Sequence, residues 1–196
     1  MPPARITTRN DRTEGVVYLV LYMLCIPAAN WMIGNVGTFC APDGGPCMLP
    51  VAPGLMAPSG VAMVGLALVL RDLVQRRLGR WWSLAAIAAG AVLSAFLAAR
   101  ALVVASTAAF LLSELADFAV YTPLQRRRFV LAVIASSAVG LVVDSMLFLW
   151  LAFGSLDFLA GQILGKAWMV LLSLPFIWWL RERDARRAES IAAARG

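Results

Sequence analysis

Six long apolar runs limit the folds that are open to this chain. They cover approximately residues 16–35, 55–73, 82–99, 101–122, 130–153 and 160–180. A membrane-spanning helix needs about 20 residues of this kind. Hydrophobic residues make up 61% of the 196 residues and charged residues 14%, so a water-soluble fold would lack the polar residues to cover its surface. We predict an all-α, polytopic membrane protein with six transmembrane helices. Its domain at 16–180 would lie between tails at 1–15 and 181–196.

The basic residues predict the orientation of these helices. Fifteen of the 17 Lys and Arg residues lie before the first run, between the second and third (71–80), between the fourth and fifth (126–128) or after the sixth. Six crossings would place these four segments on one side, and the positive-inside rule assigns that side to the cytoplasm. Both termini should therefore be cytoplasmic, in a multi-pass cell (inner) membrane protein. Short loops do not form one continuous basic face, so we expect contact with membrane lipids and no nucleic-acid partner, despite a formal net charge of +6.

The segment that leads into the second run has an unusual composition. Residues 36–53 contain no Lys or Arg and carry Cys40 and Cys47, which could form a disulfide on the outer side or remain free thiols. Three prolines at 50, 53 and 58 precede Ser59, which we predict as an N-cap. Regular helix should then begin near Gly60. The preceding part would be either a loop over the outer surface or half of a broken helix.

Polar residues inside the later runs follow helical spacing. Glu114 and Asp117 stand three residues apart, Ser137 and Asp144 follow one stripe, and Gln162 is four residues before Lys166. A charged group that faces lipid costs several kcal/mol, so these stripes should line a shared interior, together with Asn30 of the first run. That interior would hold three acids and one base.

Three interpretations of such an interior can be compared. Polar residues can simply hold helices together, but Lys166 would then neutralise one acid and leave two without an evident cation. A binding pocket accounts for all of them and is favoured. A membrane enzyme would be left with carboxylate chemistry alone, because the chain has no histidine and only Cys25 lies within a span. We expect no enzymatic activity, no metal and no cofactor.

The order and spacing of the polar residues resemble a known family. The matching positions are Asn30, Asp72 with Gly79, Arg100, Ser106, Glu114, Asp117, Ser136, Gly140, Asp144, Ser145, Ala152 to Gly154, Gln162, Lys166 and Pro175. Together they resemble the queuosine precursor transporters, also called the VUT family of vitamin uptake transporters. Arg76 and the prolines before Ser59 depart from the family pattern. The resemblance implies a six-helix importer of 7-cyano-7-deazaguanine or 7-aminomethyl-7-deazaguanine that works by alternating access.

This substrate class suggests roles for the intramembrane residues. A guanine-like edge presents an N–H and an amino group side by side, and a carboxylate can accept from both. We expect Asp144 first and Glu114 second to meet that edge, with Asp117 as a partner of Lys166 or a conformational gate. Gln162 and Asn30 could bind the amide or a ring nitrogen, and Lys166 could balance the charge or bind the carbonyl. Ser137 lies on the stripe of Asp144. Trp168 and Phe148, or alternatively Trp31 and Phe118, could stack on the ring.

The chain contains no Walker motif, so it should not hydrolyse ATP by itself. We expect no ATPase partner to be required. The alternative is the substrate-binding subunit of an energy-coupling-factor transporter, which would depend on such a partner. The sequence is compatible with a homodimer and leaves the energy source open.

Overall fold

The computed structural model describes residues 9–40, 46–98 and 102–193. It consists of six helices and one small antiparallel sheet within this part of the chain. In chain order the elements are α1 (Arg9–Asn35), β1 (Phe39–Cys40), β2 (Cys47–Ala52), β3 (Leu55–Pro58), α2 (Val61–Leu78), α3 (Arg80–Leu97), α4 (Val103–Leu124), α5 (Phe129–Phe153) and α6 (Leu159–Ala193).

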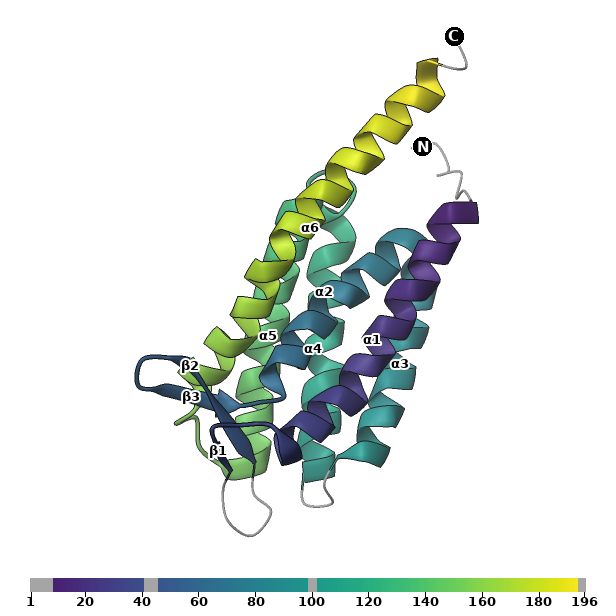
Figure 1. Cartoon of the computed structure of the whole chain (residues 1–196). Coiled ribbons are helices and arrows are strands. Elements are labelled where there is room, and N and C mark those ends of the chain that lie inside the picture. The colour runs from purple at the N-terminus through teal and green to yellow at the C-terminus, as the bar shows by residue number, and fades with distance from the viewer. Residues whose placement is uncertain (1–8, 41–45, 99–101, 194–196) are drawn as a thin grey trace.

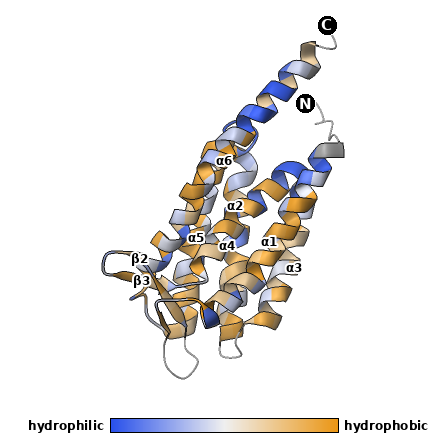
Figure 2. Ribbon diagram, in the orientation of Figure 1, coloured by the Kyte–Doolittle hydropathy of each residue, from blue (hydrophilic) through white to orange (hydrophobic). Residues whose placement is uncertain are grey.

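The helices form a bundle with the sheet at one end (Figure 1). The start of α1 and the end of α6 lie at the opposite end. Helix α2 is the central element, because it contacts each of the other five helices. Hydrophilic residues are concentrated at the end away from the sheet, while the helices are mainly hydrophobic along the rest of their length (Figure 2). This separation agrees with the predicted placement of most arginines on one side.

Five helices of the described chain, all except α2, are long and apolar enough to cross a membrane. Their outward faces carry large exposed side chains, such as Trp81, Phe96 and Trp150, that would contact lipid. The protein is therefore a multi-pass membrane protein. Helix α2 contains four charged residues in its second half, and most of its residues are buried within the bundle. Its assignment as a sixth transmembrane helix remains a prediction.

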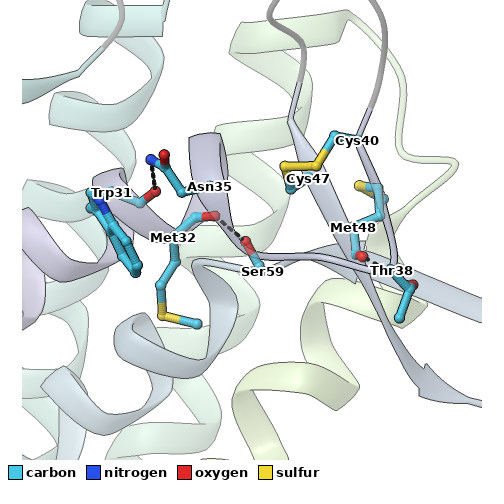
Figure 3. Close-up of a disulfide and its surroundings, with 8 residues drawn as sticks. All are labelled: Trp31, Met32, Asn35, Thr38, Cys40, Cys47, Met48 and Ser59. Carbon is cyan, nitrogen blue, oxygen red and sulfur yellow. Dashed lines mark hydrogen bonds between the residues drawn. A yellow bond between two sulfur atoms is a disulfide. The ribbon is translucent and has the colours of Figure 1, made fainter.

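The start of the predicted second span is a strand and not a helix. Residues 55–58 form β3, which pairs with β2, and β2 pairs in turn with β1. Helix α2 begins at Val61, as expected from the prolines, but Ser59 is not its N-cap. The Ser59 hydroxyl instead donates to the carbonyl of Met32 at 2.7 Å, which ties the sheet to the end of α1 (Figure 3).

The sheet contains the disulfide that the sequence left open. Cys40 of β1 and Cys47 of β2 are directly opposite one another and are bonded (Figure 3). The expected outer loop is thus a covalently closed hairpin. The remaining cysteine, Cys25, is free and buried in the bundle.

The expected loop at 71–80 is absent, because α2 continues to Leu78 and α3 begins at Arg80. Only Gly79 separates the two helices, and its φ of 95° is a conformation that favours glycine. Arg71, which was assigned to a cytoplasmic loop, is fully buried inside the bundle. That assignment is wrong, and the reason is that carboxylates surround the guanidinium.

The last helix extends well beyond the predicted end of the sixth span, and its extension takes part in an ionic cluster. Arg77 lies 2.8 Å from Asp184 of α6, 3.0 Å from Glu14 and 3.5 Å from Asp11 of α1. Arg76 also donates to Asp184, at 2.6 Å. The cluster joins α1, α2 and α6 at the end opposite the sheet.

We predict that Arg77→Met destabilises the protein by about 1–3 kcal/mol, because three acids lose a common, largely buried partner. The melting temperature of the purified protein in detergent measures this effect. Arg127→Met is the matched control, since Arg127 is exposed at the α4–α5 junction. Equal melting temperatures for the two variants would contradict a structural role for the cluster.

We also predict that the α4–α5 junction faces the cytoplasm and the α5–α6 junction faces outward. Single cysteines replacing the exposed Arg127 and Asp157 can be probed in intact cells with a membrane-impermeant maleimide. Background labelling should be low, because Cys25 is buried and Cys40 and Cys47 are bonded. Asp157→Cys should react and Arg127→Cys should react only after permeabilisation. The reverse pattern would invert the topology.

Candidate functional site: a polar cavity within the bundle

A cavity lies among the helices in the half of the bundle nearer the sheet. Its lining residues come from the second half of α1, the first halves of α2 and α4, the ends of α3 and α5 and the start of α6. The polar ones are Asn30, Ser94, Ser106, Ser113, Glu114, Asp144, Gln162 and Lys166, and Phe110 and Phe148 are the aromatic ones. Six residues predicted from the sequence, namely Asn30, Glu114, Asp144, Phe148, Gln162 and Lys166, thus border one space.

Lys166 is held by a complete set of acceptors. Its ammonium donates to Asp144 at 2.6 Å, to Ser145 at 2.7 Å and to Gln162 at 2.8 Å. Lys166 is 1% exposed. An ammonium has three protons, so all of them are used. Of the partners predicted for Lys166, Asp144 or an acid of the fourth span, the structure shows Asp144, and Lys166 acts here as the counter-charge of that acid.

Three polar residues that line the cavity still have hydrogen-bonding atoms free for a ligand. Asp144 accepts from Lys166 through Oδ2, and a carboxylate has about four acceptor positions over its two oxygens. Gln162 accepts through Oε1, which leaves its NH2 group as a donor. Asn30 has the opposite arrangement, because its NH2 group donates to the carbonyl of Ile26 and its Oδ1 remains an acceptor. The cavity therefore offers donors and acceptors at fixed positions.

Close packing of α2 against α6 positions this group. A Cβ atom on Gly65 of α2 would collide with the backbone of Lys166. Only glycine permits this approach, so Gly65 lets the two backbones meet beside the cavity. The base of the Lys166 side chain is thereby fixed against the central helix.

A second buried cation lies next to the cavity. Arg71 donates through Nε to Glu114 at 3.2 Å and through Nη2 to Asp117, and its Nη1 lies 3.0 Å from Asp72. Nη1 also donates to Gln75 at 3.2 Å. The expectation that two acids would lack a cation is therefore wrong. Asp117 is also not the partner of Lys166, because Arg71 binds it instead.

The surroundings of Arg71 are polar on one side and aromatic on the other. Ser136 of α5 donates to Asp72 at 2.9 Å. The rings of Phe118 and Tyr121 lie 6.0 and 5.7 Å from the guanidinium carbon, so Phe118 faces Arg71. The sequence held a signal for this cluster, since Arg71 and Asp72 have apolar residues on both sides in LVLRDLV. The cluster was missed because Arg71 was assigned to a cytoplasmic loop, where arginines usually lie in membrane proteins.

Several predicted site residues lie elsewhere. Trp168 is 48% exposed and its indole donates to the carbonyl of Val51, so it supports the sheet from outside the cavity. Trp31 is also exposed, on the outer face of α1. Ser137 is fully buried but does not line the cavity. Asp117 lies behind Glu114, in the Arg71 cluster. Arg100 lies outside the described residues.

The chain was compared with known protein families, curated proteins and solved structures. Residues 59–180 match the model of a family described as "Putative vitamin uptake transporter". This segment runs from just before α2 into α6 and contains Arg71 and Lys166 with the acids that surround them. No curated protein and no solved structure matched significantly. Because the match covers more than half of a chain whose apolar helices form a multi-pass bundle, the protein belongs to the family of putative vitamin uptake transporters.

Proposed function

We propose that the protein imports a queuosine precursor, 7-cyano-7-deazaguanine or its aminomethyl relative, across the inner membrane. The observation that carries this proposal is the convergence of Asn30, Glu114, Asp144, Gln162 and Lys166 on one cavity within the helix bundle. Such a cavity suits a small, planar solute with several donors and acceptors. The chain would act as a carrier and not as an enzyme.

In this proposal Asp144 recognises the base edge. Its charge is balanced by Lys166, and its spare lone pairs accept the N–H and the exocyclic amino group of the ligand. The NH2 group of Gln162 donates to the ligand carbonyl, and Oδ1 of Asn30 accepts a further proton. Phe110 and Phe148 border the same space and supply apolar faces for the ring.

The position of the cavity supports transport by alternating access. It lies in the sheet half of the bundle, and the ionic cluster around Arg77 and Asp184 holds α1, α2 and α6 together at the other end. If the sheet faces outward, the cavity is placed to receive solute from outside. Release to the cytoplasm then requires these three helix ends to separate.

Uptake by the purified chain in lipid vesicles tests the transport activity. We expect radiolabelled 7-cyano-7-deazaguanine to exchange across the membrane, with competition by the aminomethyl relative and none by adenine. Vesicles that contain only this chain also address the alternative of a subunit dependent on an ATPase. Binding without any exchange would support that alternative and contradict an autonomous carrier.

Asp144→Asn should weaken binding of the deazaguanine by over a hundredfold, on the order of 3 kcal/mol, because an acceptor oxygen becomes a donor that faces a donor. Equilibrium binding to the detergent-purified variant measures this loss. Asp157→Asn, at an exposed position between α5 and α6, is the matched control and should bind normally.

The single substitution also leaves the buried ammonium of Lys166 without its acid, which lowers the stability of the fold. The double variant Asp144→Asn/Lys166→Met removes both charges and separates the two effects. We expect it to have near wild-type thermal stability and still not bind the ligand. A stable double variant with near wild-type affinity would contradict base recognition by Asp144.

A further inference from the structure

The buried charges of the bundle do not balance. Among the described side chains, Arg71 has three carboxylates around it, from Asp72, Glu114 and Asp117. All four groups are at most 2% exposed. The neighbouring pair of Lys166 and Asp144 is neutral and cannot compensate for the excess. With every group ionised, this part of the interior would carry a charge of −2.

A protein interior does not tolerate two uncompensated charges, because a buried carboxylate without a partner takes up a proton instead. The hydrogen bonds of the cluster also indicate that it can bind protons. Oδ2 of Asp117 is buried and accepts no hydrogen bond, and Oδ1 of Asp72, although near Arg71, accepts none of good geometry. Unpaired carboxylate oxygens are the atoms to which a proton can be added. The cluster therefore has sites for bound protons.

Glu114 differs from the two aspartates because it alone of the three also lines the cavity. Its single charged hydrogen bond is the one from Arg71 Nε, at 3.2 Å, whereas Asp72 is supported by Ser136 as well as Arg71. A proton can thus reach Glu114 from the cavity. A ligand in the cavity can contact the protonated carboxyl group of Glu114.

The titratable and charged groups around Glu114 come from nearly every helix. Helix α1 contributes Tyr22 and Cys25, α2 contributes Arg71 and Asp72, α4 itself contributes Asp117, and α5 contributes Asp144. Lys166 of α6 lines the same cavity and is bound to Asp144. Helix α3 contributes Ser94 to the cavity but no titratable group there. The acids outnumber the cations in this set, so no neighbouring helix supplies the charge that would balance the cluster.

We propose that Glu114 binds a proton that crosses the membrane together with the solute, so that the protein is a proton symporter. This inference rests on the proposed transport function. The proton comes from water in the outward-facing cavity and converts the carboxylate of Glu114 to a carboxylic acid. The neutral acid donates its O–H to an acceptor on the ligand, such as the carbonyl oxygen, while Asp144 accepts from the neighbouring N–H and amino group of the same edge.

Release reverses these steps on the other side. When the ligand leaves, Glu114 loses its proton to cytoplasmic water, and the carboxylate is again bound by Arg71. Proton and solute favour one another because the neutral acid needs an acceptor and the ligand carbonyl has a second lone pair besides the one that Gln162 binds. No bond other than O–H is made or broken, and the inward proton gradient supplies the free energy.

Infrared difference spectroscopy of the purified protein tests the proton site without any substrate. The wild-type protein should show absorption from protonated carboxyl groups near neutral pH, and Glu114→Gln should lose one component of it. Glu182→Gln is the matched control, because Glu182 is exposed on the extension of α6. An unchanged carboxyl band in Glu114→Gln would overturn the assignment to Glu114.

Transport in vesicles tests the coupling. With the membrane potential clamped at zero, an acidic exterior should drive accumulation of 7-cyano-7-deazaguanine, up to about tenfold for each pH unit of gradient with one proton per solute. A protonophore should abolish it. The readout is the ratio of uptake with and without the gradient. That ratio should fall to one in Glu114→Gln, whose amide still donates, and should stay as in wild type in Glu182→Gln.

The outcomes separate the two proposals. Exchange of solute by the wild-type protein without any response to the gradient would overturn proton coupling and leave the transport function standing. A gradient response that persists in Glu114→Gln would overturn the role of this residue. If no deazaguanine is exchanged or bound, the proposed substrate is wrong, and the infrared result alone then decides whether Glu114 holds a proton.

Discussion

The burial of the Arg71 guanidinium is the constraint on which the rest of the bundle depends. A cation can lie in the interior of a membrane protein only if charged acceptors surround it. Asp72 comes from the same helix, whereas Glu114 and Asp117 must come from α4. This requirement fixes α2 beside α4, and α2 in turn contacts every other helix. Removing the arginine would leave three buried acids without a cation.

Arg71 and Lys166 lie in surroundings of different net charge, which suggests different roles. Lys166 and Asp144 neutralise one another, and the hydroxyl of Ser145 and the amide of Gln162 complete the hydrogen bonds of the ammonium. Such a pair can present fixed hydrogen-bonding groups without changing its own charge. The Arg71 cluster has an excess of acid, on which the proposed proton site rests. Glu114 belongs to this cluster and also borders the cavity, so a change in its protonation would change the charge and the hydrogen-bonding groups at the proposed solute site.

The two ends of the bundle are closed by different chemistry. At one end, a disulfide-linked sheet is attached to α1 through Ser59 and to α6 through the indole of Trp168. At the other end, ion pairs centred on Arg77 and Asp184 join three helices. Ion pairs can separate and form again without any covalent bond being broken, whereas a disulfide persists in an oxidising compartment. The ionic end is therefore better suited to open during a transport cycle.

The sequence by itself determined the membrane class and the helix start near Gly60, because hydropathy and the positions of proline act locally along the chain. Helical spacing also predicted that Asp144 and Lys166 share one interior. It did not determine the sheet at 55–58, since strand pairing depends on a partner segment that spacing does not reveal. It also misassigned Arg71 and Asp117. Whether an arginine lies in water or inside a bundle depends on which acids a distant helix brings to it. Only the packing of α2 against α4 decided that, because the burial of a charge is a property of its neighbours in space.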